Sequence, residues 1–60
     1  MNIDKKKFFQ MIVDTGGNPS VKDFMSCGYS EGMAVEHVIR MSQNNPDVYV
    51  KVAKEFLKNN

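Results

Sequence analysis

The sequence predicts an all-α fold, a small domain of three to four helices that takes up residues 1–60. Two observations carry this prediction. Apolar residues recur at spacings of three and four, which places them on one side of a helix. Glycine, proline and asparagine interrupt these runs at Gly16-Gly17, at Gly28 and at Asn44-Asn45-Pro46, where short turns are expected. No alternating pattern is long enough to indicate a sheet.

The first helix is expected to begin after Asp4, whose side chain can cap it. Gly16-Gly17 should end it, because glycine readily adopts the left-handed conformation that follows a helix. Lys5, Lys6 and Lys7 fall in its first turn, where the helix dipole disfavours cations. They are either a solvated helix start or serve a role outside the helix. The apolar stripe is formed by Phe8, Phe9, Ile12 and Val13, with Met11 beside it.

The second helix is expected to be short. Pro19 suits a helix entry, and Ser20 with Asp23 three residues later is a capping-box pattern with Asp in place of the usual Glu. Gly28 should end this helix after about two turns. Its apolar surface is supplied by Val21, Phe24, Met25 and Cys27.

The third and fourth helices have equally clear starts, Ser30 for the third and Asn45-Pro46-Asp47 for the fourth. Residues 48–52 are β-prone in composition, but the capped start and the apolar spacing favour a helix. The buried stripe of the third helix is predicted to be Met33, Ala34, Val38 and Met41, flanked by Val35 and Ile39. That of the fourth is predicted to be Tyr49, Val52, Ala53 and Phe56, widened by Leu57.

Composition excludes several functions. One cysteine, Cys27, rules out an intrachain disulfide, and one cysteine with one histidine, His37, cannot supply the four ligands of a structural zinc site. No cofactor motif or catalytic group is recognisable, so we expect no cofactor and no enzymatic activity. Cys27 is interpreted as a buried, inert thiol and His37 as a structural histidine, with a pH-sensitive charge as the alternative.

Partners and location can be narrowed in the same way. A net charge of +1 is not typical of a strong non-specific nucleic-acid binder. No apolar run approaches the roughly 20 residues of a membrane span, and the start lacks a signal-peptide pattern. We therefore expect a cytoplasmic protein without membrane association. Because neither disulfide nor metal is available, self-association, most simply as a homodimer, is the remaining aid to the stability of so short a chain.

One stretch points to nucleic acid. The segment Gly28-Tyr29-Ser30, Met33-Ala34 and His37-Val38 resembles the turn and recognition-helix spacing of LuxR-type helix-turn-helix proteins over residues 20–43. The resemblance implies that Tyr29 fills the angle between the two helices and that Ala34 and Val38 face the core. It also implies a DNA-binding transcriptional regulator, which would contact DNA through Lys22, Glu36, Arg40 and Gln43.

The methionines favour a protein partner instead. Met11, Met25, Met33 and Met41 are internal, and methionine packs well against irregular surfaces or fills gaps in a small core. Four short helices cannot bury every apolar side chain here, and apolar residues left at the surface mark interfaces. We therefore expect a small non-enzymatic regulator or inhibitor. Its composition is analogous to that of the small regulators that mobile elements often encode. Its predicted contact residues are Met33, Val35, Ile39, Arg40, Tyr49 and Val50.

Overall fold

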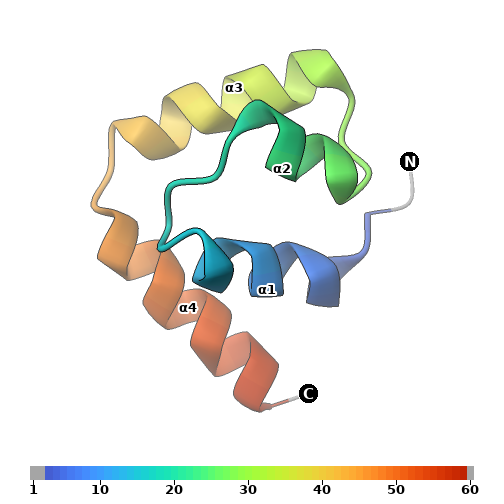
Figure 1. Cartoon of the computed structure of the whole chain (residues 1–60). Coiled ribbons are helices and arrows are strands. Elements are labelled where there is room, and N and C mark those ends of the chain that lie inside the picture. Colours follow the sequence, from blue (N-terminus) through green and yellow to red (C-terminus); the bar gives the residue numbers. More distant parts are fainter. Residues whose placement is uncertain (1–2, 60) are drawn as a thin grey trace.

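The computed structural model describes residues 3–59, and within them the chain forms four helices and no strand. The helices are α1 (Lys5–Asp14), α2 (Val21–Ser26), α3 (Glu31–Ser42) and α4 (Pro46–Lys58). The prediction of a small all-α domain is confirmed. Figure 1 shows α2 lying beside α3 on one side of the molecule and α1 crossing α4 on the other.

Each helix begins where its capping residue predicts. Asp4 accepts a hydrogen bond from the backbone N–H of Lys7 at 3.0 Å, and Asn45 accepts one from Asp47 at 2.9 Å. Ser20 and Asp23 form the full reciprocal capping box. Ser30 caps α3 through a longer hydrogen bond of 3.4 Å from the backbone N–H of Met33. Side-chain caps satisfy N–H groups that have no partner inside a helix, so they fix these four starts.

Glycine in the left-handed conformation ends the first two helices, as predicted. Gly16 and Gly17 have φ angles of 63° and 82° after α1, and Gly28 has a φ of 110° after α2. Gly17 is also buried, because the chain passes close to Pro46 at the start of α4 there. The turn after α1 therefore packs directly against α4.

The core is small. Its fully buried members come from all four helices and from the residue that ends α2. They are Met11, Ile12, Phe24, Cys27, Ala34 and Ala53. Two alanines among them, both 0% exposed, allow the backbones of α3 and α4 to lie close to their neighbours.

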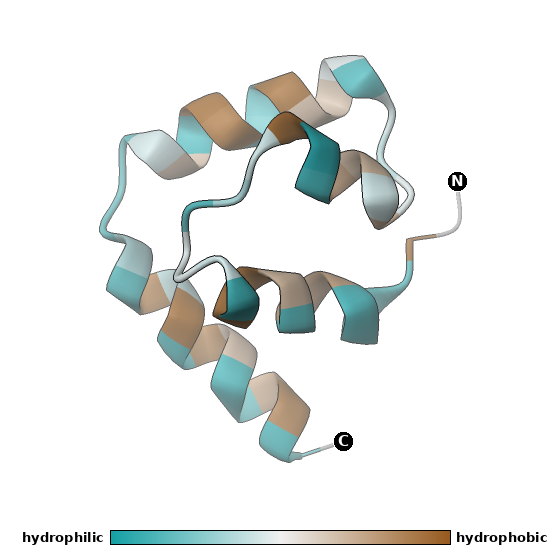
Figure 2. Cartoon of the chain, in the orientation of Figure 1, coloured by the Kyte–Doolittle hydropathy of each residue, from teal (hydrophilic) through white to brown (hydrophobic). Residues whose placement is uncertain are grey.

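Two of the predicted buried positions are wrong. Met33 is 36% exposed and Val52 is 55% exposed, although both were expected in buried stripes. Each lies at the edge of a stripe that is wider than the single neighbouring helix can cover. The broader expectation that apolar side chains remain at the surface is confirmed, and Figure 2 shows hydrophobic segments recurring along α3 and α4. The exposed large apolar side chains are Met25, Met33, Val35, Ile39, Val48 and Val52.

Candidate functional site

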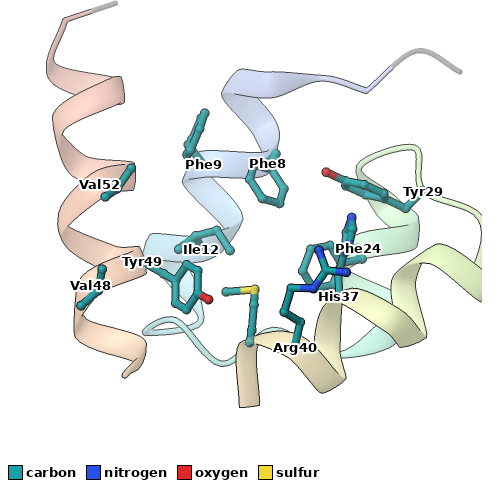
Figure 3. A pocket seen from close by; sticks show the side chains of 11 residues that line it. Phe8, Phe9, Ile12, Phe24, Tyr29, His37, Arg40, Val48, Tyr49 and Val52 are labelled. Carbon is teal, nitrogen blue, oxygen red and sulfur yellow. The ribbon is translucent and has the colours of Figure 1, made fainter. Parts of the chain in front are cut away.

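An apolar groove lies between the two helix pairs. Its volume is about 330 Å³. One wall comes from α4, the floor from α1, and the other wall from α2, α3 and the turn between them (Figure 3). The residues that line this groove are Phe8, Phe9, Ile12, Phe24, Tyr29, His37, Arg40, Met41, Val48, Tyr49 and Val52.

A cluster of rings forms the floor and joins the two helix pairs. The Phe8 ring on α1 lies 5.9 Å from the rings of both Phe24 and Tyr29, measured between centroids. Phe24, 1% exposed, packs edge-on against Tyr29 at 5.4 Å. Edge-to-face ring pairs at these distances are favourable beyond the area that they bury. The α1 floor and the wall formed by α2 and the following turn therefore share one continuous aromatic surface.

His37 is part of this ring cluster. Its imidazole lies 4.9 Å from the Tyr29 ring and 5.5 Å from the Phe24 ring, edge-on to both. His37 is half-buried, in agreement with its interpretation as a structural histidine. Tyr29 fills the angle between α2 and α3, as its place in the turn predicts.

The hydroxyl of Tyr29 is held in its neutral form. Burial raises the pKa of this hydroxyl above the ordinary value of 10.0, and the nearby Cys27 thiol raises the pKa further by charge repulsion. Partial removal from water disfavours the charged phenolate. Tyr29 therefore offers the groove a neutral polar group and no negative charge.

The groove carries one permanent charge, the Arg40 guanidinium. Figure 3 shows Arg40 rising from α3 beside His37 on the wall opposite α4. Among residues 3–59, no aspartate or glutamate lines the groove. The guanidinium has no hydrogen bond or ion pair with any residue in the described range 3–59. An apolar groove with a single cation at its edge favours an occupant that is apolar along its length and carries an anion.

The α4 wall presents the most exposed aliphatic residues of the molecule. Val48 is 57% exposed and Val52, one turn later, is 55% exposed. Tyr49 and Phe56 lie on the adjoining side of α4, and the Phe56 ring stacks on Phe9 of α1 at 4.2 Å. Val48 and Val52 therefore lie next to the packed contact between α1 and α4, and more than half of each side chain is exposed to solvent.

The residues predicted to contact a protein partner do not form one surface. Arg40 and Tyr49 line the groove. Met33 lies on the same side of α3, because residues 33, 37 and 40 are spaced by four and three. Val35 and Ile39 occupy the opposite edge of α3. Val50 is half-buried and does not line the groove.

The residues predicted to contact DNA are all exposed. Lys22 lies on α2, and the other three lie on α3 or at its end. Arg40, the strongest candidate for reading a base, is directed into the groove rather than away from the molecule (Figure 3). Glu36 and Gln43 lie on the side of α3 that faces away from the core. Ala34 and Val38 face the core.

The described residues contain no group of three or more histidine, cysteine or acidic side chains that could hold a metal ion. Cys27 is 3% exposed and unpaired. No helix in residues 3–59 has the length and apolar character needed to cross a membrane.

Comparison of the chain with protein-family models, curated proteins and solved structures finds no match.

Sequence reasoning missed most of the groove. The sequence patterns assign Val48 to a β-prone run, Val52 to the stripe of the fourth helix, and Phe8 and Phe9 to the apolar stripe of the first, and none of these patterns predicts a groove. One signal was present, since the apolar face of α4 spans Val48 to Leu57 on more than half its circumference. A face that wide needs two neighbours, and the structure supplies α1 on one side and open groove on the other.

Proposed function

We propose that this protein is a small non-enzymatic regulator that binds a protein partner through the groove. The observation that carries the proposal is the open, almost wholly apolar lining, with Val48 and Val52 more than half exposed above an aromatic floor. Monomeric proteins seldom leave such contiguous apolar surface uncovered unless it serves an interaction. Met41 in the wall can adapt to an irregular partner surface.

The exposure of the groove favours side chains of a protein over a cofactor. Small-molecule sites bury most of their ligand's surface, whereas this groove has Val48 and Val52 in its wall more than half exposed. An amphipathic helix can place apolar residues at spacings of three and four into a groove of this kind. The partner is therefore proposed to present a helix. That helix can also come from a second copy of this chain, which would make a homodimer.

Two aspartate substitutions, one at a valine and one at an isoleucine, test which surface binds the partner protein. Val52→Asp places a charge in the groove, whereas Ile39→Asp places one on the opposite edge of α3, and the two parent side chains are 55% and 54% exposed. Purified wild type and both variants, checked for helicity by circular dichroism, are used to capture partners from cells that make the protein. We expect Val52→Asp to lose a partner that Ile39→Asp retains.

The opposite result would place the interface on the outer edge of α3. Equal capture by all three proteins would contradict binding through either surface. A photo-crosslinking residue at position 48 provides an independent measurement. Its crosslinks should map to one helix of the captured protein.

A helix-turn-helix regulator is the second candidate, favoured by one observation. The short α2, the Gly28 turn and the Ser30-capped α3 follow one another in the order that such a motif requires. Against it, Arg40 lines the groove, and Glu36 on the outer side of α3 would face phosphates. Titration of a labelled mixed-sequence duplex at low and moderate salt tests this candidate. Phosphate contacts would give binding that weakens steeply with salt.

A further inference from the structure

The groove and the ridge that borders it are complementary to each other, which points to a second copy of this chain as an occupant. The ridge consists of Val48, Val52 and Glu55 on α4. These residues are spaced by four and three, so they share one side of the helix. All three are exposed. The ridge thus offers two apolar side chains followed by one carboxylate.

The groove offers the matching pattern. Its lining is apolar along α1 and α4, and its one permanent charge is the Arg40 guanidinium on the far wall. Neither the Arg40 guanidinium nor the Glu55 carboxylate has a partner in the described part of the chain, residues 3–59. A second α4 lying across the groove would bring two valines and a carboxylate to a lining of rings and one guanidinium. Arginine and carboxylate form strong, directional pairs.

Symmetry allows both copies to make this contact at once. The α4 helix is a wall of the groove and also carries the ridge, so a twofold axis near Val48 and Val52 pairs each ridge with the other copy's groove. Such an isologous interface is the commonest arrangement of homodimers. The net charge of +1 gives two copies little reason to repel each other.

We propose that the chain forms a homodimer in which the α4 ridge of each copy occupies the groove of the other, with Glu55 pairing with Arg40 across the interface. This inference rests on the proposed function, because the dimer covers the same groove that the partner protein would use. Self-association and partner binding are then mutually exclusive. The partner-binding form is then the monomer.

Charge exchange tests the pairing. Sedimentation equilibrium of purified wild type, Arg40→Glu, Glu55→Arg and the double variant gives the dimer dissociation constant of each. Each single variant should weaken the dimer at least about ten-fold, because it places like charges opposite each other. The double variant should recover most of the lost affinity. Glu31→Arg, which reverses an exposed carboxylate at the start of α3, nine residues before Arg40 and outside the groove lining, is the matched control and should leave dimerisation unchanged.

Three results would overturn the proposal. They are a wild type that stays monomeric at high concentration, a double variant no better than the singles, and a Glu31→Arg variant as weak as Glu55→Arg. None of these depends on the partner protein. A monomeric wild type whose partner capture is still lost in Val52→Asp would remove the dimer and leave the proposed function standing. A dimer that depends on the groove, together with no captured partner, would support the dimer and contradict the proposed function.

Discussion

At the scale of single residues, two adjacent glycines have different roles. Both Gly16 and Gly17 have positive φ angles, which cost an L-residue roughly 1–2 kcal/mol. A side chain on Gly16 would meet open space, but a Cβ on Gly17 would lie 2.8 Å from the Cβ of Pro46 and even closer to the Pro46 carbonyl oxygen. Gly17 is thus required both for the turn and for the approach of α4.

Alanine at each position separates these two requirements. Gly16→Ala should lower the free energy of unfolding by roughly 1–2 kcal/mol through backbone strain alone. Gly17→Ala should lower it by about 1–3 kcal/mol more, because α4 must shift to make room. Urea denaturation followed by circular dichroism measures both. Equal losses in the two variants would mean that the contact with Pro46 contributes nothing.

At the scale of helices, the short α2 depends on its cap more than α3 does. The six-residue α2 has a reciprocal capping box, in which the Asp23 carboxylate accepts hydrogen bonds from the backbone N–H and the hydroxyl of Ser20 at 2.8 and 2.9 Å. The twelve-residue α3 has a single, longer capping hydrogen bond, which the Ser30 hydroxyl accepts from the backbone N–H of Met33. A short helix has few internal hydrogen bonds to offset the cost of starting it.

Removal of the two serines should therefore have unequal effects. Ser20→Ala should cost about 1 kcal/mol or more, equivalent to a fall in Tm of roughly 4–8 °C in a domain of this size. Ser30→Ala, the matched change, should cost less. Thermal melts by circular dichroism compare them. A larger loss for Ser30→Ala would show that the stability of α3 and not of α2 depends on the cap.

The same scale explains what the sequence could predict. Helix starts are decided by contacts within three residues, such as Ser20 with Asp23, so all four were predictable from local patterns. The groove depends on how two helix pairs meet, and no local pattern records that arrangement. Val52 has the spacing of a core residue, yet it faces the groove because the wall opposite α4 stands away from it. Met33 is exposed for a similar reason, since α2 is too short to cover the whole of α3.

At the scale of the whole molecule, the two helix pairs are held together chiefly by the ring cluster beneath the groove. Phe24 contributes the central ring, in contact with Phe8 on α1 and with Tyr29 and His37 on its own side. One backbone hydrogen bond, from Asp4 to the Cys27 carbonyl at 3.3 Å, adds a second link between the pairs. The groove therefore exists only while this cluster is intact.

Phe24→Ala should unfold the protein and not merely weaken it. Truncation of a buried phenylalanine costs about 3–5 kcal/mol, whereas a chain of 60 residues has a total stability of about 3–9 kcal/mol. Phe24→Leu keeps most of the buried volume and should remain folded with a lowered Tm. Circular dichroism and the dispersion of amide signals in NMR distinguish the two states. A folded Phe24→Ala variant with native dispersion would mean that the helix pairs are joined by contacts other than these rings, and the aromatic floor would then be free to change without loss of the fold.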